Sequence, residues 1–210
     1  MLNLESLKEV QRKIAKEVSL KDSVDISQIK TVAGFDVAFS EKSAFCTGVI
    51  LKFPGFEIVE KKEIKTKIPM KYFPGFLAFR EGPPIIEVLR EFENEFDAAF
   101  VKGHGIAHPL KAGIACYVGI NISKPTIGVA KELLSGEIRN DKIYMDGELR
   151  GFKIVTKQGS RPLYISPGHL ISQKGTLELV KKCLVENHKM PEPIFQAHKL
   201  NREFRIENLK

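Results

Sequence analysis

The chain has 210 residues, and 33 Lys and Arg against 26 Asp and Glu give it a formal net charge of +7 at neutral pH. A hydrophobic fraction of 43% excludes an intrinsically disordered chain, and the longest uncharged stretch, residues 112–123, is shorter than the ~18 residues of a membrane-spanning helix. Three cysteines without a C-x-x-C pair encode neither a disulfide framework nor a structural zinc site. We therefore expect one soluble globular domain over residues 1–210, cytoplasmic, monomeric and not bound to a membrane.

The positive charge is unevenly distributed along the chain. Residues 1–105 contain 16 basic and 16 acidic side chains, whereas residues 106–210 contain 17 and 10, so the second half carries the whole excess. A basic half suits nucleic acid, because each neutralised phosphate releases condensed counterions. The same excess also occurs in proteins that are merely soluble, so charge alone leaves the partner open. Candidate phosphate contacts in this half are Lys111, Lys124, Lys131 and Arg139.

The first third of the chain predicts one helix and a three-stranded meander. Apolar residues at three-to-four spacing over residues 4–18 predict an amphipathic helix that packs on a sheet. Runs of β-type residues follow at 31–40, 44–53 and 57–68. Short polar or Pro-Gly links separate these runs, and such links join antiparallel neighbours.

Asp36 is the first candidate functional residue. In the run 31–40 the aromatic and aliphatic side chains alternate, so Asp36 faces the opposite side of the strand, together with Gly34 and Ala38. A carboxylate between two small residues leaves room for a ligand.

A second carboxylate precedes the next predicted helix. Pro83 and Pro84 introduce apolar residues at helical spacing, and proline is well tolerated at a helix start, where its missing N–H has no partner anyway. This pattern places Glu81 at the helix entrance. A Glu in that place often only answers the helix dipole, so it is weak evidence by itself.

The remaining elements alternate between strands and helices. Ala98–Lys102 is a short apolar run of the buried parallel type, Gly113–Asn121 predicts a buried helix, and Pro125–Ala130 predicts another strand. A basic β-rich stretch covers 142–165. Ser172 then caps one helix, and Pro191-Glu192-Pro193 introduces the last, from Ile194 to Asn208.

This order of elements matches a mixed sheet of the ribonuclease H type, in which acidic residues from different elements converge. Asp36 and Glu81 occupy two such places. Carboxylate oxygens are the ligands that Mg²⁺ and Mn²⁺ prefer, and such ions support phosphodiester hydrolysis.

Two histidines, His104 and His108, stand four apart in the loop Gly103–Pro109. The spacing resembles that of a zinc-protease helix, but two glycines and the closing proline oppose a helix, and no Glu follows the first His. We therefore expect a loop that presents imidazoles at the end of a strand, where ligands bind in open α/β sheets.

Tyr72, Phe73 and Pro74 form an aromatic, rigid segment in the loop before Gly75. Proteins that act on single bases insert such apolar wedges into a base stack. A small apolar core under the loop is an equally good interpretation from the sequence.

Six blocks of sequence together resemble endonuclease V, the nuclease family of deaminated-base repair. They span nearly the whole chain and follow one another in the family's order. The blocks are Val32–Ala38, Tyr72–Glu81, Gly103–Pro109 continuing through Gly113–Ala115, Pro125–Lys131, Ser166–His169 and Pro191–Pro193.

The resemblance implies a ribonuclease H-like α/β fold with a mixed five-stranded central sheet flanked by helices. It implies a DNA-repair endonuclease that hydrolyses the second phosphodiester bond on the 3′ side of hypoxanthine. The implied partner is DNA containing deoxyinosine, with inosine-containing RNA as a second substrate. The implied cofactor is Mg²⁺, with Mn²⁺ as an alternative.

The resemblance also implies roles for individual residues. Asp36 and Glu81 are similar to the metal-site carboxylates of the family. His108 is similar to the imidazole that orients or protonates near the scissile phosphate, and Lys131 to a charge partner there.

The substrate-binding residues follow from the same resemblance. Tyr72, Phe73 and Pro74 are similar to the strand-parting wedge, although Lys71 stands where many relatives have another proline. The pocket for the extruded base is then lined by Leu77, Gly103, Gly113, Ile114 and Leu134.

Lys102 departs from the family pattern. Members carry an Asp metal ligand at this position, just before the Gly-His-Gly loop, whereas an ammonium group has no lone pair for Mg²⁺ and competes for the charge of Asp36 and Glu81. Asp97 cannot replace the ligand, because five residues along a strand span ~16 Å. Two main hypotheses remain: an endonuclease impaired at Lys102, and a non-cleaving binder of deaminated nucleic acid. An unrelated hydrolase with a histidine site is a third.

Overall fold

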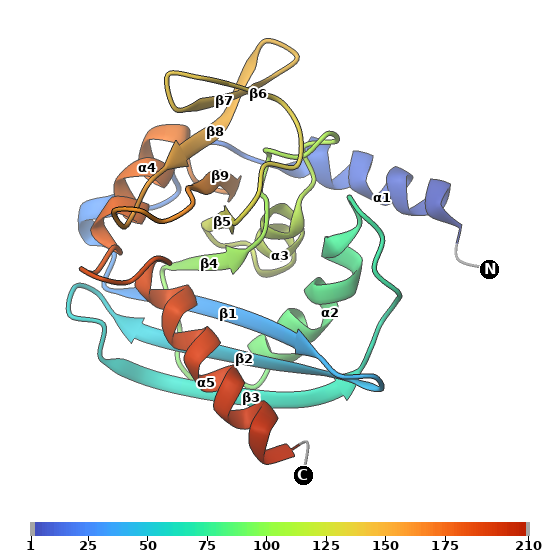
Figure 1. The fold of residues 1–210 in the computed structure, drawn as a ribbon, viewed down its shortest axis with the longest axis vertical. Coiled ribbons are helices and arrows are strands. Elements are labelled where there is room, and N and C mark those ends of the chain that lie inside the picture. Colours follow the sequence, from blue (N-terminus) through green and yellow to red (C-terminus); the bar gives the residue numbers. More distant parts are fainter. Residues whose placement is uncertain (1–2, 209–210) are drawn as a thin grey trace.

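Residues 3–208 of the computed structural model form a nine-stranded mixed sheet with helices on both faces (Figure 1). The strand order is β3-β2-β1-β4-β5-β9-β8-β7-β6. The strands are β1 (Thr31–Phe39), β2 (Ser43–Lys52), β3 (Ile58–Lys67), β4 (Ala98–Lys102), β5 (Thr126–Ala130), β6 (Glu137–Arg139), β7 (Lys142–Met145), β8 (Glu148–Ile154) and β9 (Leu163–His169). The helices are α1 (Leu4–Glu17), the short 3₁₀ helix η1 (Ile26–Gln28), α2 (Leu77–Leu89), α3 (Ile114–Ile122), α4 (Gln173–Lys182) and α5 (Glu192–Asn208).

The expected order of strands is confirmed, but five strands were too few. β1, β2 and β3 form the antiparallel meander, and β4 and β5 run parallel to β1. β9 pairs antiparallel with β5, and β8, β7 and β6 continue the sheet beyond it. The basic β-rich stretch therefore joins the central sheet, because β8 pairs with β9, and β7 and β6 follow in turn.

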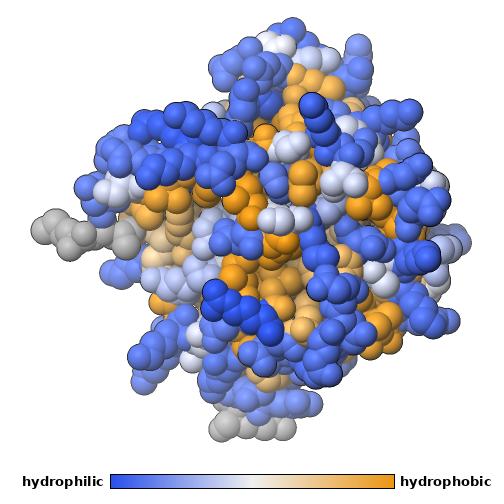
Figure 2. Space-filling view, turned by 180° about the vertical axis from the view of Figure 1, so that it is seen from behind, coloured by the Kyte–Doolittle hydropathy of each residue, from blue (hydrophilic) through white to orange (hydrophobic). Residues whose placement is uncertain are grey.

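Two apolar cores cover the two faces of the sheet. One contains side chains from α4 and α5, and the other contains side chains from α2 and α3. Figure 2 shows the face opposite α5, where apolar side chains gather in the middle and polar ones surround them. No helix between residues 3 and 208 has the length and apolar content that a membrane span needs.

The amphipathic pattern of the first helix predicted that it packs on the sheet, and this prediction is wrong. α1 lies against α3, where Ile14 packs with Ile106, Ala112 and Cys116 in a small separate core. This contact is possible because α3 already covers the sheet and presents a second apolar side outward.

The second helix begins six residues before the prolines that were expected to start it. α2 runs from Leu77, with Pro83 and Pro84 inside, so Glu81 lies within the helix and not at its entrance. The prolines remove two backbone hydrogen bonds, but the helix continues because one side of it is buried in the core. Local proline chemistry is here overridden by burial.

The strand face expected to leave room for a ligand is covered by α5, which crosses β1 (Figure 1). A Cβ atom added to Gly34 would lie 2.0 Å from the carbonyl oxygen of Pro193, at the start of α5. The small residue beside Asp36 therefore admits a helix backbone rather than a ligand.

This close approach gives a first prediction. Gly34→Ala must push α5 away from β1, and overpacking of this kind costs about 1–3 kcal/mol of the free energy of unfolding. Urea unfolding monitored by circular dichroism measures the loss. Unchanged stability would mean that α5 is not held against Gly34 as described.

Candidate functional site

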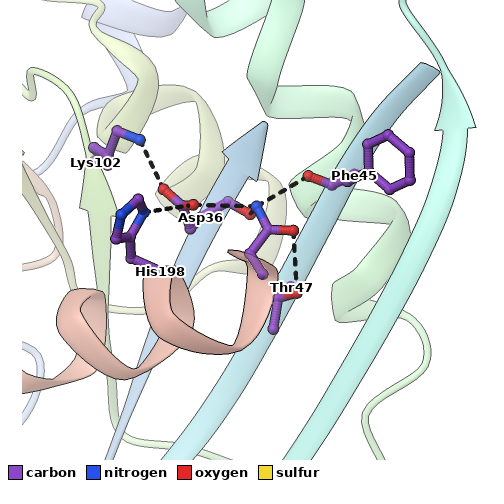
Figure 3. Close-up of polar contacts among 6 residues, drawn as sticks. Asp36, Phe45, Thr47, Lys102 and His198 are labelled. Carbon is purple, nitrogen blue, oxygen red and sulfur yellow. Dashed lines mark hydrogen bonds and ion pairs between the residues drawn. The ribbon is translucent and has the colours of Figure 1, made fainter. Parts of the chain in front are cut away.

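The centre of the site is formed by two neighbouring parallel strands. β1 and β4 pair with Phe35 opposite Val101, so the next residue of each strand, Asp36 and Lys102, emerges beside the other. The Nζ atom of Lys102 donates a hydrogen bond to Oδ1 of Asp36 at 2.7 Å, and the two side chains form an ion pair (Figure 3). Strand register thus brings together residues that are 66 positions apart.

The other oxygen of Asp36 is held by α5. The side-chain amide of Asn201 donates to Oδ2 at 3.1 Å, and Nδ1 of His198 lies 3.0 Å from the same atom (Figure 3 shows His198). Asn201 also donates to the backbone oxygen of Phe45 at 3.3 Å and lies 3.3 Å from the hydroxyl of Thr47. One amide therefore fixes the carboxylate of β1 and the neighbouring strand β2 together.

Asp36 is only 3% exposed, so its charge depends on these partners. Burial favours the neutral carboxyl group, but the Lys102 ammonium and the hydrogen bonds from Lys102, Asn201 and His198 outweigh it and lower the pKa of Asp36 below its usual value. The Asp36 carboxylate is therefore ionised, and the positive charge of Lys102 balances its negative charge.

Glu81 joins the site from α2. Burial raises the pKa of its carboxyl group to about 7, with a further increase from the charge of Asp36 and opposing effects of Lys102 and Arg80. The charges of Asp36, Lys102 and Glu81 therefore influence one another, and the metal-site roles of these positions stay predictions. Near neutral pH the Glu81 carboxyl group is partly protonated.

The residues of the site do not fit the divalent cation that the family resemblance implies. No group of three or more His, Cys, Asp and Glu side chains among residues 3–208 could hold a metal ion. The oxygens of Asp36 already accept from Lys102 and Asn201. A divalent ion ~4 Å from the ammonium would also be repelled by about 8 kcal/mol at an effective dielectric constant of ~20. The expected Mg²⁺ site is thus disfavoured in this chain.

The ring nitrogens of His108 contact backbone groups of the surrounding loops. Its Nδ1 accepts from the backbone N–H of Leu110 at 3.1 Å, so the neutral ring carries its proton on Nε2, which lies 3.0 Å from the carbonyl oxygen of Gly75. Burial lowers the pKa of His108, which favours this neutral form. Both ring nitrogens are engaged by the backbone, so His108 positions the loop before α2.

A second buried side chain holds the same loop. Nε2 of Gln11, on α1, donates to the Gly75 carbonyl oxygen at 2.7 Å. Gln11 is 1% exposed, whereas Tyr72 and Phe73 on the loop are 63% and 36% exposed. The aromatic residues therefore project from a loop whose base is fixed, and the alternative of a small core beneath them is not what this loop forms.

A cavity of about 170 Å³ opens beside the aromatic loop. Five of the predicted substrate-binding residues line it, together with His104, whose Nε2 lies 3.0 Å from the backbone oxygen of Glu132. Those five are Tyr72, Leu77, Gly113, Ile114 and Leu134.

Gly103 lies behind the wall of this cavity, because a Cβ atom there would meet Ile114 at 2.5 Å and Leu77 at 3.3 Å. Phe73 and Pro74 do not line it. The site is smaller than the ~300 Å³ at which pockets for drug-sized ligands begin, so it suits a single flat ring system.

The basic residues of the second half do not form a continuous free track. Lys111 pairs with Glu148 at 2.5 Å, Lys124 pairs with Glu95 at 2.6 Å, and Arg139 pairs with Glu137. Lys131 is exposed one residue past the end of β5. Three of the four candidate phosphate contacts thus already have an acidic partner.

His198 and Asn201 were missed by the sequence reasoning. The signal available for Asn201 was its place on the buried side of α5, with Ile194 and Ala197, where a polar residue needs a partner. Nothing local distinguishes His198, whose side chain is 58% exposed, since its partner lies 162 residues away.

The pKa of Glu81 gives a prediction for stability against pH. A carboxyl group with a pKa near 7 when folded and 4.5 when unfolded binds its proton more tightly in the folded state, so stability falls as pH rises through this interval. The Gln side chain cannot ionise. We expect Glu81→Gln to exceed the wild type in stability by up to about 3 kcal/mol above pH ~7, and by little below pH ~4.5.

Urea unfolding at about pH 4, 6 and 8 measures this difference, and Glu91→Gln, at an exposed glutamate beyond α2, is the control. A stability difference between Glu81→Gln and the wild type that stays constant with pH would contradict the burial of an ionisable Glu81.

The clamp on Gly75 gives a prediction for the aromatic loop. Gln11→Leu removes one hydrogen bond, worth about 1 kcal/mol, so the loop should open about fivefold more often and trypsin should cut after Lys71 about fivefold faster. Ser6→Leu, which adds a leucine at an exposed position of α1, is the control. Equal cleavage rates in the two variants would show that His108 alone holds the loop.

Known proteins of one family resemble this chain in sequence and in fold. The Endonuclease V family model matches residues 12–199. Endonuclease V of Archaeoglobus fulgidus is 36% identical over 211 residues, which cover 98% of this chain and 95% of that protein. The catalytic domain of human endonuclease V, with four cysteines substituted, has a TM-score of 0.88 and 29% identity over 98% of this chain and 97% of that one.

Endonuclease V of Ciona intestinalis, solved in complex with a 24mer DNA containing an inosine followed by a ribo-adenosine, has a TM-score of 0.87 and 24% identity over 99% of both chains. These likenesses confirm the expected α/β fold. Because the family model and the Archaeoglobus relative both cover most of its length, the chain belongs to the endonuclease V family of nucleases.

Proposed function

We propose that the chain recognises hypoxanthine, the base of deoxyinosine, in DNA and holds it outside the duplex in the cavity beside the aromatic loop. The observation that carries this proposal is that Tyr72 is both highly exposed and part of the cavity lining. A base that leaves the duplex opens a gap in the stack, and an exposed aromatic side chain beside the receiving pocket can fill it. The inosine-containing DNA bound by the Ciona intestinalis relative supports the same ligand.

The lining of the cavity suits a purine that is read by backbone groups. Leu77, Ile114 and Leu134 supply aliphatic surfaces for the two faces of the ring. Gly113 caps α3 without a side-chain hydrogen bond, but its own N–H and that of Ala115 donate to the backbone oxygens of Gly105 and His104 at 3.1 Å each. The N–H groups that remain at this helix start are those of Ile114 and Cys116, which have no acceptor within the helix. Such donors can bind the acceptor edge of hypoxanthine. Inosine-containing RNA offers the same base and is the second proposed substrate.

The proposed reaction is hydrolysis of the second phosphodiester bond on the 3′ side of the base, and in this chain we expect it to be slow. The family resemblance implies a third acidic ligand at position 102. Lys102 supplies a positive charge there instead, and this charge pairs with Asp36. Lys131, exposed after β5, and the exposed His198 are proposed phosphate contacts. His108 has a positioning role in this proposal, through Gly75.

A second candidate function is a binder of deaminated nucleic acid that does not cut. The 2.7 Å contact between Lys102 and Asp36 favours it. Lys102 balances the charge of the buried carboxylate, but its side chain cannot coordinate a metal ion. Recognition and cutting depend on different groups, so the two functions share the cavity and the aromatic loop.

Substitution at position 102 tests both candidates. With Mg²⁺ and a duplex that contains one deoxyinosine, Lys102→Asp should cut faster than the wild type by more than about a hundredfold, because even outer partners of a metal ligand contribute about 10–100-fold. Lys102→Asn, which removes the ammonium without supplying a carboxylate, should not recover cutting. All three proteins should bind this duplex more tightly than a matched undamaged one.

The outcomes separate the two parts of the proposal. Equal cutting rates for the wild type and Lys102→Asp would contradict the ligand assignment. A lack of preference for the deoxyinosine duplex in every variant would contradict base recognition.

A further inference from the structure

The ammonium group of Lys102 has donors left after it pairs with Asp36. An ammonium carries three N–H groups, and one of them bonds to Oδ1 of Asp36 at 2.7 Å. The Lys102 side chain is 32% exposed, while that of Asp36 is 3% exposed, so the pair is buried on the carboxylate side and open on the lysine side. A ligand arriving from outside would meet the ammonium first.

An anion that reaches Lys102 also meets the Glu81 carboxyl group, whose charge interacts with that of Lys102. The other carboxylate of the site repels an anion less. The Asp36 carboxylate is turned inward and is compensated by Lys102, Asn201 and His198. His198 adds a 58% exposed imidazole on the α5 side of the pair. On the other side β5 pairs with β4, with Val129 opposite Lys102, and the exposed Lys131 follows two residues later.

We propose that the Lys102 ammonium is a resident cation that takes the place of a divalent metal ion in holding a phosphodiester group of the nucleic acid. The chain then binds its ligand without any divalent metal. This inference rests on the proposed function, since it assumes that nucleic acid occupies the cavity and the loop beside this site.

The physical reason is the charge that a phosphate meets at an acidic site. Carboxylates alone repel a phosphodiester, and a site of this kind normally needs a bound cation to bring the two together. Lysine is a compact point charge and a regular phosphate ligand in proteins. Because Lys102 is covalently part of the chain, its charge cannot be removed by a chelator.

The test is the affinity for a labelled duplex with one deoxyinosine, measured by fluorescence anisotropy in excess EDTA and in Mg²⁺. We expect the wild type to bind equally well in both. Lys102→Met should bind about 10–100-fold more weakly in EDTA, as expected for the loss of a hydrogen bond between charged groups. The slope of log Kd against log salt concentration should fall by about 0.9, which corresponds to one phosphate contact.

Three further variants keep the test independent of folding. Lys102→Arg retains the charge and should bind in EDTA. The double variant Asp36→Asn with Lys102→Met removes both charges together, leaves no buried charge unpaired, and should bind as weakly as Lys102→Met. Lys182→Met is the control, because Lys182 lies near Asp25, ahead of β1 and at the opposite end of that strand from Asp36. It should bind like the wild type.

The results distinguish this inference from the proposed function. Wild-type binding that requires Mg²⁺, or Lys102→Met affinity and salt dependence equal to those of the wild type, would overturn the role of the ammonium. If the deoxyinosine duplex bound no better than an undamaged one, base recognition would fail. The comparison of EDTA with Mg²⁺ on the undamaged duplex would still decide the role of Lys102.

Discussion

The site depends on the burial of one carboxylate, that of Asp36. An ionised carboxylate with 3% exposure is stable only when charged and hydrogen-bonding groups surround it, and here β4 supplies Lys102 while α5 supplies Asn201. These partners come from distant parts of the chain, so the carboxylate ties three elements to one point. The path of α5 across β1, close enough to exclude any side chain at position 34, follows from this requirement.

The same partners limit what the carboxylate can do chemically. Each group that donates to Asp36 occupies a lone pair that a metal ion would otherwise use, and Lys102 also brings a positive charge. Stability of the buried charge and affinity for a divalent cation are therefore in opposition at this position. The cavity is lined by the aromatic loop, α2, the loop after β4, the start of α3 and the segment after β5, and neither Asp36 nor Lys102 is among its lining residues.

The sequence predicted the parts of the fold that follow from local periodicity. The strands β1 to β5 lie within a few residues of their expected bounds, and Ser172 caps α4 as expected. The start of α2 was wrong because a buried apolar face outweighs the preference of Pro83 for a first turn. The strand count was too low because pairing of β9 with β5 is a long-range event with no local signal.

The candidate site divides along the same line. The resemblance assigned Asp36 and Glu81 to a metal site and His108 to the scissile phosphate, and these roles stay predictions, while in the structure the His108 ring nitrogens contact Gly75 and Leu110. A motif identifies a residue, while its hydrogen-bond partners decide what it does. The net charge of +7 likewise does not describe the surroundings of each basic residue. Three of the four candidate phosphate contacts are paired with carboxylates. Exposed pairs of that kind are weak, so pairing alone does not prevent Lys111, Lys124 and Arg139 from contacting a phosphate.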